Sequence, residues 1–512
     1  MVDGHGEPIV LDPKTRLTID GLADVAGGRA VSLSPLADER LAAARAVVEE
    51  TLAADIAAYG LNTGLGDARD RRVSERALLD YQKAIIRLHA GGIGPALPAT
   101  AVRAAMAVRV NSAIRGGSGI RPRTARMLVD MLNAGVHPVV PAIGSVGASD
   151  LMHLAAIALV LIGDGEAEVG GRVLPGREAM AQAGLEPLEL APLEGLALIS
   201  ANSMAAGHGA IVVRRAEQLV ATADAVVALS LEAIDGNLSV IDAQVGMAKP
   251  VPGQIEALDH LNRLLAGSRL FEEGAASSLQ DPLSFRVVPQ VHGAAREFVR
   301  FARQAVEIEL NAMDDNPLVS IAERRLLSNG NFHPMAMALS FDAVRPALTH
   351  LGLCSIRRMN HLTGRHLGAV SQFEALTNAM ADESPRGLST YAAAALFAEV
   401  RHLAGPATLD IQSLDLEQED HATAAPNSIA VTERVIDLLQ RILAVELDCA
   451  SSVIDRTQTG QLGRGAEVAH RLVKTAVAAS ESPTAAAIND RIVELLDRGD
   501  FLREVDAAAA LS

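Results

Sequence analysis

The stretch Gly144-Ser145-Val146-Gly147-Ala148-Ser149-Asp150-Leu151 decides how this chain is interpreted. Its glycines and small side chains are typical of backbone that turns sharply or lies close to another group. The apolar run that follows, Leu154–Gly163, predicts a buried helix. Similar glycine clusters lie upstream, separated by shorter predicted helices, at Gly60–Gly66, Gly91–Gly94 and Gly116–Gly119. The first part of the chain is therefore expected to present several tight loops.

The composition indicates a large folded protein that binds neither nucleic acid nor membrane. The chain has 512 residues, of which 49% are hydrophobic and 21% charged, enough for two or more packed units or one extended helical body. A net charge of -17 would repel nucleic acid and anionic lipid. The run Leu154–Gly163 looks like the longest apolar stretch and is too short to span a bilayer.

The cysteines and the N-terminus predict a cytoplasmic location. Cys354 and Cys449 are too few for a disulfide framework and lack the spacing of metal ligands. The segment 1–13 has no apolar core, which argues against a secretory signal. No metal site, phosphate-binding loop or nucleotide fingerprint is expected from the sequence.

Helical periodicity dominates the second part of the chain. Apolar residues recur at spacings of three and four on one helical face at Val431, Val435, Leu438, Ile442 and Val445. Comparable patterns cover 210–243, 290–313, 343–362 and 392–403. Helices that are apolar most of the way round must be surrounded by other helices or subunits. We expect an N-terminal domain over 1–203 and a helical bundle over 204–512, as part of an oligomer.

Further short motifs occur along the chain, and each alone is an ordinary turn, helix start or core segment. They are Tyr59-Gly60-Leu61-Asn62-Thr63-Gly64-Leu65-Gly66, Leu88-His89-Ala90-Gly91-Gly92-Ile93-Gly94, Gly195-Leu196-Ala197-Leu198-Ile199-Ser200, Gln280-Asp281-Pro282-Leu283-Ser284-Phe285-Arg286, Met313-Asp314-Asp315-Asn316-Pro317-Leu318, Asn329-Gly330-Asn331-Phe332-His333 and Glu417-Gln418-Glu419-Asp420-His421.

In this order, and together with Gly144–Leu151, these motifs resemble those of the histidine and aromatic amino acid ammonia-lyases over nearly the whole chain. The resemblance implies a mainly α-helical fold, a long-helix bundle of the histidine ammonia-lyase and fumarase-like type with a smaller glycine-rich N-terminal domain. It also implies a homotetramer in which loops from three subunits line each active site. The expected reaction is elimination of an amine from an amino acid.

The resemblance assigns roles to individual residues. Tyr59 is the expected general base, activated if neighbouring cations lower its pKa. Arg286 would hold the substrate carboxylate with its two-pronged guanidinium. Glu419, typical of histidine-specific members, and His89 would face an imidazole ring. The remaining expected substrate-binding residues are Asn62, Ser149, Ser200, Gln280, Asn316 and Phe332.

Three departures from the family pattern affect its prosthetic group. In the family, an Ala-Ser-Gly triad cyclises into the electrophile methylidene-imidazolone, but here the glycine after Ser149 is missing. A deletion keeps Asp150 in register with the following helix, whereas a glycine-to-aspartate substitution would shift that helix by one residue. Ser200 replaces an asparagine that bonds the ring, and Leu283 replaces a tyrosine. We therefore expect no cofactor, because a residue with a Cβ resists the contorted path of cyclisation.

Three functional hypotheses follow. The favoured one is a prosthetic-group-free carbon-nitrogen lyase that resembles ergothionase and releases trimethylamine from a histidine-derived betaine, either ergothioneine or hercynine. The second is an ordinary histidine or aromatic amino acid ammonia-lyase whose ring forms from Ala148, Ser149 and Asp150. The third is a catalytically silent helical scaffold, which the retained Tyr59, Arg286 and Glu419 disfavour.

Overall fold

The computed structural model describes residues 6–367, 389–409, 411–457, 460–480, 482 and 484–510, with no side chains described over 365–367. Its contacts divide the chain into two compact units. Unit 1 comprises Met1–Arg214, Ala302–Phe341 and Ala407–Ala430, and unit 2 comprises Arg215–Phe301, Asp342–Pro406 and Val431–Ser512. The division falls inside four long helices: α9 (Ser203–Ile234), α13 (Val288–Glu309), α14 (Met335–His361) and α17 (Ala425–Thr457). The domain boundary expected near residue 203 stays a prediction.

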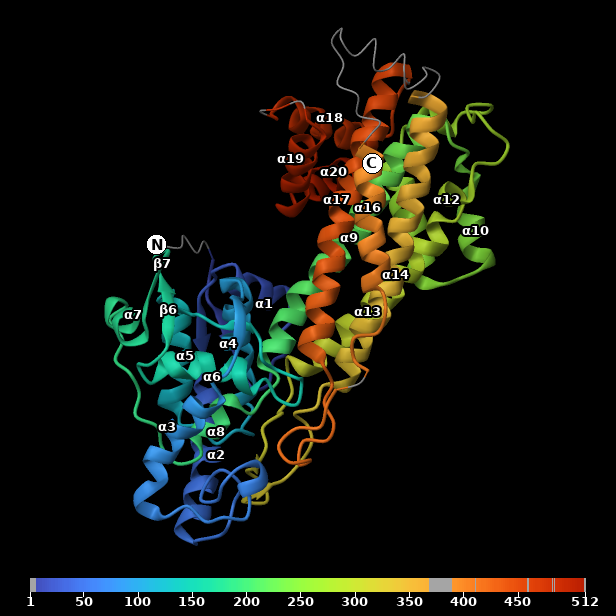
Figure 1. The fold of residues 1–512 in the computed structure, drawn as a ribbon. Coiled ribbons are helices and arrows are strands. Elements are labelled where there is room, and N and C mark those ends of the chain that lie inside the picture. Colours follow the sequence, from blue (N-terminus) through green and yellow to red (C-terminus); the bar gives the residue numbers. More distant parts are fainter. Residues whose placement is uncertain are drawn as a thin grey trace. The chain divides into compact units, whose positions relative to one another are not determined.

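Unit 1 combines short helices with small sheets (Figure 1). Its other α-helices are α1 (Ile19–Ala26), α2 (Pro35–Ala53), α3 (Leu78–His89), α4 (Ala99–Ala113), α5 (Pro122–Asn133), α6 (Leu151–Leu161), α7 (Gly176–Gln182) and α8 (Glu194–Ile199). Its strands are β1 (Ile9–Leu11), β2 (Val31–Leu33), β3 (Ile93–Ala96), β4 (His137–Pro138), β5 (Pro141–Ile143), β6 (Glu166–Val169), β7 (Arg172–Pro175), β8 (Leu318–Ser320) and β9 (Arg325–Leu327).

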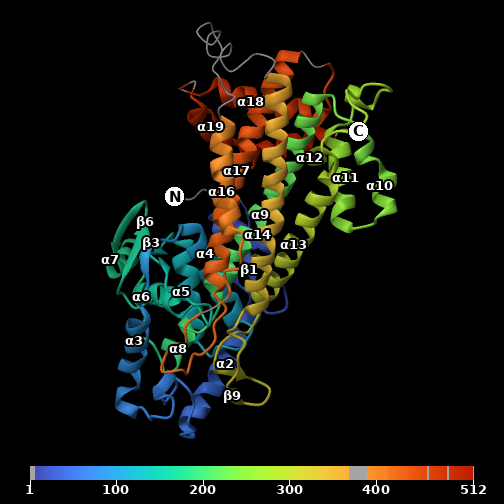
Figure 2. The ribbon, with the colours of Figure 1, turned by 45° about the vertical axis from the view of Figure 1, so that its right-hand side comes forward.

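The strands of unit 1 are short and form only small sheets. β1 and β2 are parallel, while β3 pairs with β5, β4 with β6, β6 with β7, and β8 with β9, all antiparallel. Helix α7 packs against β6 at one edge of the unit (Figure 2). The expectation of a mainly helical fold is confirmed.

The core of unit 1 surrounds α4, which is buried from Ala101 to Ala113 and packs against α1 and α5. Helices α3 and α8 also approach each other closely. A Cβ added at Gly195 would lie 2.4 Å from the carbonyl oxygen of Gln82, so only glycine permits this contact. The Gln82 Oε1 accepts a hydrogen bond from the Gly195 amide at 2.9 Å. This packing holds α3, which ends at His89, against α8, which Ser200 follows.

Over its described residues, unit 2 is built mainly from helices. Besides its parts of the four long helices it contains α10 (Ala243–Ala248), α11 (Pro252–Leu264), α12 (Leu283–Arg286), α16 (Ser389–Leu403), α18 (Arg464–Ala478), α19 (Ala485–Asp497) and α20 (Asp500–Ala509). Helix α11 packs against α10, α18 and α20, and Figure 2 shows it beside α10. A buried carboxylate on α9, Asp224, joins these elements through His260 on α11 and His292 on α13, each at 2.7 Å.

The periodicity predicts the long helices well and their ends less well. In α17, Val435, Leu438 and Ile442 are buried, as their spacing predicts. The helix expected over 210–243 ends instead at Ile234. There the backbone turns through Asp235, whose φ is +55°. A turn of this kind depends on one residue's backbone conformation, which the apolar pattern does not encode.

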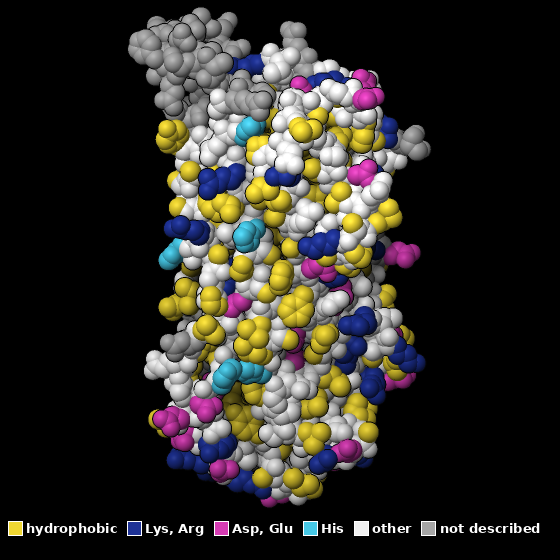
Figure 3. Space-filling view, turned by 90° about the vertical axis from the view of Figure 1, so that its right-hand side faces the viewer, with side chains coloured by type: hydrophobic (Ala, Val, Ile, Leu, Met, Phe, Trp, Pro, Cys, Tyr) yellow, Lys and Arg dark blue, Asp and Glu magenta, His cyan; other side chains and the backbone are white. Residues whose placement is uncertain are grey.

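One expectation about apolar stretches is wrong. The helical stretch Glu194–Ile234 is longer than Leu154–Gly163 and is apolar enough to cross a membrane by length and composition alone. In the structure, 94% of its most apolar window is buried inside the protein, as in a core helix. Apolar residues also remain at the surface, as the face drawn in Figure 3 shows. On α13, Phe298 and Phe301 are 44% and 46% exposed.

Candidate active site

The loop before α6 is held by an aspartate. Asp150 is fully buried, and its carboxylate accepts hydrogen bonds from the Ser145 hydroxyl at 2.8 Å and the Ala205 amide at 2.7 Å. The Asp150 amide donates to the carbonyl oxygen of Ala201 at 2.7 Å. Every one of these bonds fixes the same residue, so the start of α6 is firmly anchored.

Ser149 lies in the turn that precedes this anchor. Its φ of +58° is a left-handed conformation that side chains with a Cβ rarely adopt. Its amide donates to the carbonyl oxygen of Phe332 at 3.0 Å, which brings two predicted substrate-binding residues together. The side chain of Ser149 is 6% exposed.

A second loop, over 411–424, contacts the first. The Thr423 hydroxyl donates to the Gly147 carbonyl at 2.7 Å, and the Ala424 amide donates to the Val146 carbonyl at 2.8 Å. A Cβ at Gly147, whose φ is +80°, would lie 2.2 Å from Thr423 Oγ1. Glycine at this position therefore allows the loop that carries Glu419 to lie against the loop that carries Ser149.

Ser200 and Asn316 are joined directly. The Ser200 hydroxyl donates to the Asn316 carbonyl at 3.3 Å and accepts from the Asn316 amide at 3.2 Å. The side-chain oxygen of Asn316 accepts from the Asn329 amide at 3.2 Å. The residue before Asn316, Asp315, forms an ion pair with Arg109, with 2.6 Å between Asp315 Oδ1 and Arg109 Nη2. Both side chains are 2% exposed. Burial raises the pKa of Asp315 to about 7 despite this cation.

The loop that carries Tyr59 is shaped by Asn62. The Asn62 side chain accepts from the Ala58 amide and donates to the Ile56 carbonyl, both at 2.9 Å, which closes the turn around Tyr59. The Tyr59 hydroxyl accepts a hydrogen bond from the Gly66 amide at 3.0 Å. Asn62, predicted to bind substrate, thus uses its side chain for two hydrogen bonds within its own loop.

Asp415 connects this loop to the segment over 411–424. Its Oδ2 accepts from the Asp67 amide at 3.1 Å, and it lies so close to Gly66 that a Cβ there would overlap it. Asp415 is the first of three successive residues with positive φ, followed by Leu416 and Glu417. Sequence reasoning missed Asp415, since neither its contact nor this backbone conformation leaves a local pattern.

The charges around Tyr59 differ from the expectation that cations would lower its pKa. Burial raises the pKa of the Tyr59 phenol, and the nearby carboxylates of Glu419 and Asp415 raise it further. The Gly66 amide and Arg69 act in the opposite direction without reversing the shift. Within unit 1 the phenol is therefore held neutral, because the described groups nearest to it are mainly acidic.

His89 and Glu419 influence each other electrostatically. The Nδ1 of His89 lies 2.7 Å from the Ile85 carbonyl oxygen, which can only accept, so Nδ1 carries a proton and a neutral ring leaves Nε2 as an acceptor. Burial raises the pKa of Glu419, as does Asp415, while His89 lowers it. The structure thus links Tyr59, Glu419 and His89 in one electrostatic cluster.

Gln280 and Arg286 belong to unit 2. Gln280 is exposed, and its carbonyl oxygen accepts from the Ser278 hydroxyl at 3.0 Å. Arg286 ends α12 and forms no ion pair with any residue that the structure describes. Leu283, in the place of the family's tyrosine, is 61% exposed. A free guanidinium suits the binding of a carboxylate.

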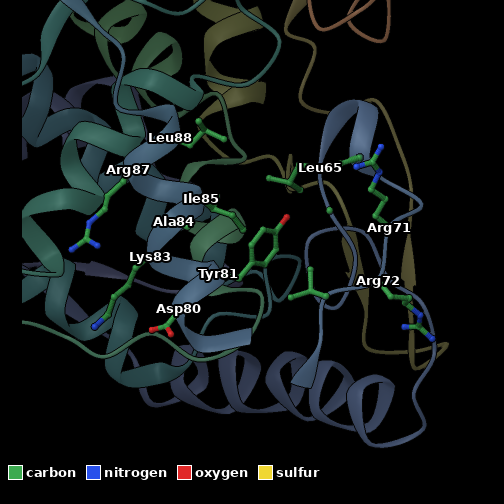
Figure 4. A pocket seen from close by; sticks show the side chains of 13 residues that line it. Leu65, Arg71, Arg72, Asp80, Tyr81, Lys83, Ala84, Ile85, Arg87 and Leu88 are labelled. Atoms are coloured by element: carbon green, nitrogen blue, oxygen red, sulfur yellow. The ribbon is translucent and has the colours of Figure 1, made fainter. Parts of the chain in front are cut away.

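A cavity of about 870 Å³ lies between the segment 64–73 and α3. Figure 4 shows the Tyr81 hydroxyl pointing from α3 into it, beside Leu65, while Lys83 and Arg87 point away. Burial raises the pKa of Tyr81, and Tyr59 raises it further, so the two phenols are neighbours. The sequence offered no signal for Tyr81, because it lies outside the recognised motifs.

Comparison with known proteins places this arrangement in a family. The model of the aromatic amino acid lyases matches residues 17–475. The chain belongs to this family. It is 38% identical over 497 residues to a histidine ammonia-lyase of Gloeobacter violaceus, with 96% of each chain covered.

Solved structures of the family superpose over the same length. The ergothionase of Treponema denticola matches with a TM-score of 0.90 and 28% identity, covering 97% of this chain and 100% of that one. The histidine ammonia-lyase of Trypanosoma cruzi matches with a TM-score of 0.88 and 29% identity, covering 98% and 95%. The expected fold is therefore confirmed, and so is the expectation of an enzyme of the ammonia-lyase kind.

Proposed function

We propose that this aromatic amino acid lyase eliminates an amine from a histidine-like substrate, with a trimethylammonium betaine, ergothioneine or hercynine, as the favoured substrate. The products are trimethylamine and a urocanate-type acrylate. The structure of an ergothionase is among those that superpose over the whole chain, which supports this choice.

The observation that carries the proposal is the set of hydrogen bonds around Asp150. A ring built from Ala148, Ser149 and Asp150 requires the Asp150 nitrogen to bond to the Ala148 carbonyl carbon. That nitrogen instead donates to Ala201, while the carboxylate holds Ser145 and Ala205. Asp150 thus occupies an anchored position at the start of α6, which supports a deletion of the glycine. We infer from these bonds that Ala148, Ser149 and Asp150 do not form the prosthetic ring.

Without that ring, the leaving group must depart without activation. A quaternary nitrogen meets this need, since the electron pair of the broken Cα–N bond leaves with neutral trimethylamine. A base removes the β-proton, and the electrons of that C–H bond form the new double bond. Tyr59 is the proposed base, and Arg286 is proposed to hold the carboxylate.

The acidic surroundings of Tyr59 also favour a cationic substrate. Glu419 and Asp415 raise the pKa of the phenol, as burial does. A permanent positive charge placed beside these groups would offset them and favour the phenolate. His89 and Glu419 are proposed to hold the imidazole ring, and Asn62, Ser149, Ser200, Gln280, Asn316 and Phe332 to line the pocket. The substrate would thereby add to the positive charge of Arg69, which does not by itself offset burial and the two carboxylates.

We further propose a cytoplasmic homotetramer, in which Arg286 and Gln280 reach the Tyr59 cluster of another subunit. The free cysteines Cys354 and Cys449 are compatible with a reducing compartment.

A second candidate function is histidine ammonia-lyase activity, favoured by the 38% identical relative that bears this name. Incubation with ergothioneine, hercynine and histidine separates the two, with trimethylamine and ammonia assayed beside the ultraviolet band of the acrylate. The betaine proposal predicts trimethylamine release and an unmodified Gly144–His153 peptide. Release of ammonia from histidine alone, or a peptide lighter by two waters, would refute it.

A further inference from the structure

Two histidines without a role so far join two segments of the candidate site. The Nε2 of His333 lies 3.0 Å from the Nδ1 of His421, a hydrogen-bond distance, and the ring centres are 4.9 Å apart. His333 directly follows Phe332, and only Asp420 separates His421 from Glu419. Both segments belong to unit 1. Each histidine is thus a close sequence neighbour of a residue proposed to bind the substrate.

His333 is fixed to the start of a helix. Its amide donates to the Gly330 carbonyl at 3.1 Å, and its carbonyl oxygen accepts from the Met335 amide at 2.8 Å. Met335 is the first residue of α14, where the Ala338 amide donates to the Pro334 carbonyl at 3.0 Å. The imidazole therefore projects from anchored backbone and offers a fixed point for a partner.

Glu419 closes a tight turn two residues before His421. The Leu414 amide donates to the Glu419 carbonyl at 2.9 Å, and the Glu419 amide donates to the Leu414 carbonyl at 3.2 Å. Within the turn the Gln418 amide donates to the Asp415 carbonyl at 3.0 Å. The backbone of Glu419 is therefore fixed within its own turn, and the placement of that turn depends on contacts with other segments.

The two segments are also connected through the loop before α6. That loop bonds to the Phe332 carbonyl through the Ser149 amide at 3.0 Å, and to the Thr423 hydroxyl through the Gly147 carbonyl at 2.7 Å. The histidine pair adds a direct bond between the two outer segments, so the three segments contact one another pairwise. Because a closed set of contacts restricts movement more than an open chain does, the pair limits how far Phe332 and Glu419 can separate.

The bond needs one ring to donate and the other to accept. A neutral imidazole carries one N–H and one lone pair, so the two nitrogens bond when their tautomers are complementary. Partial burial lowers the pKa of His333 and the nearby His421 ring lowers it further, although backbone hydrogen bonds oppose the shift. His333 is therefore the neutral partner near pH 7 and can take either role.

We propose that His333 and His421 are a positioning pair, whose hydrogen bond sets the spacing of two segments that bind the imidazole ring of the substrate. The inference rests on the proposed function and deepens it at the same site. The two histidines act through their neighbours Phe332 and Glu419 and not on the reacting atoms. Loss of the bond should therefore weaken binding of the ring and leave the elimination step nearly unchanged.

The test removes the bond and then restores it. His333→Leu removes the bonding atom, whereas the amide of a glutamine reaches about as far as Nε2, so His333→Gln can keep the bond. Urocanate binding is measured by calorimetry, and KM and kcat on whichever of ergothioneine, hercynine or histidine turns over. We expect His333→Leu to weaken urocanate binding and raise KM about fivefold, with kcat within about twofold. His333→Gln should stay within about twofold in all three quantities. His402→Leu, at an exposed histidine on α16, is the matched control and should change nothing.

A merely structural role gives a different result. Loss of folded protein lowers the apparent kcat and leaves KM unaltered, because KM does not depend on the amount of active enzyme. A double-mutant cycle adds the second partner: His421→Leu should match His333→Leu, and the double variant should lose no more affinity than either. Additive losses, or unchanged KM and urocanate affinity in both single variants, would overturn the proposal.

The outcomes also separate this inference from the proposed function. If histidine turns over with release of ammonia, betaine elimination fails, but the cycle keeps its meaning because histidine carries the same imidazole ring. If Glu419→Gln alone leaves KM and urocanate affinity unchanged, Glu419 does not bind the ring and the inference fails with it.

Discussion

At the scale of single residues, the candidate site is defined by what surrounds Tyr59. The phenol accepts one bond from Gly66 and faces Glu419 and Asp415, all within unit 1. A base must lose its proton before it acts, and this environment opposes that loss. The site therefore needs a cation from the substrate or from another subunit.

Replacing Tyr59 by Phe should lower kcat by about 10² to 10⁴, since proton abstraction by a positioned base contributes that much. The fold should persist, because the hydroxyl accepts a single hydrogen bond. The control is Tyr81→Phe, a neighbouring phenol with no assigned role, for which less than a threefold change is expected. Unaltered turnover in Tyr59→Phe would remove this residue from the base role.

The pH dependence should differ between the free and the substrate-bound enzyme. Because the pKa of Tyr59 is raised in unit 1, kcat/KM should climb with pH on the alkaline side, as the phenolate forms. With a trimethylammonium substrate bound, the rise of kcat with pH should occur at lower pH than the rise of kcat/KM. Identical limbs in the two profiles would contradict activation by the substrate's charge.

Glu419 is expected to control affinity for the imidazole-bearing cation. Glu419→Gln keeps the shape and removes the charge, so KM should rise about tenfold or more, the loss typical of a charged hydrogen bond. Glu417→Gln, an exposed neighbour two residues earlier, is the matched control and should behave as the unaltered enzyme. An equal KM for both variants would show that Glu419 does not contact the substrate.

At the scale of elements, a histidine in unit 2 links three helices through ion pairs that depend on its protonation. His260 on α11 lies between Asp224 on α9, at 2.7 Å, and Asp506 on α20, at 2.9 Å. Arg296 and His292 on α13 contact the same Asp224 carboxylate. Burial is the largest single influence on the pKa of His260, and it lowers that pKa. The hydrogen bonds and charges of Asp224 and Asp506 together outweigh it and raise the pKa to about 9.

Stability should therefore fall as the solution becomes alkaline. A pKa raised from 6.5 to about 9 contributes stability that is fully present below pH 6.5 and lost as pH rises through 9. The shift corresponds to roughly 3 kcal/mol at most. Urea unfolding at pH 6 and pH 9.5 measures it, and His260→Gln should flatten the difference. His350→Gln, exposed on α14, should leave the pH dependence unchanged.

At the scale of the whole molecule, the exposed aromatic side chains of α13 bear on assembly. Phe298 and Phe301 are 44% and 46% exposed, and the face in Figure 3 carries further apolar groups between charges. Burial of such side chains stabilises association by about 1.5 to 3 kcal/mol each. They fit the proposed homotetramer.

Phe301→Glu should shift the assembly toward smaller species in light scattering and lower activity in parallel, if Arg286 serves another subunit's site. Leu79→Glu replaces an exposed leucine on α3 and serves as a comparison at an unassigned surface. A Phe301→Glu variant that keeps both its mass and its activity would argue against assembly through this face.

The order of the motifs was enough to predict the family, the helical class and most of the cluster. Periodicity at Val435, Leu438 and Ile442 predicts a helix because burial on one face repeats with the helical turn. The motifs around Tyr59, His89 and Glu419 also predict a shared site, and within unit 1 these groups influence one another electrostatically. These features depend on residues close together in sequence or on a pattern that the family shares.

Other features depend on contacts between distant segments, which no local pattern records. Asp150 is anchored by Ala201 and Ala205, and Tyr59 is surrounded by carboxylates from the segment over 411–424. A pKa depends on every charge nearby in space, so the sign of the shift at Tyr59 became visible only in the folded chain. Local residue types therefore specify which groups are available, while packing sets their partners and their charge.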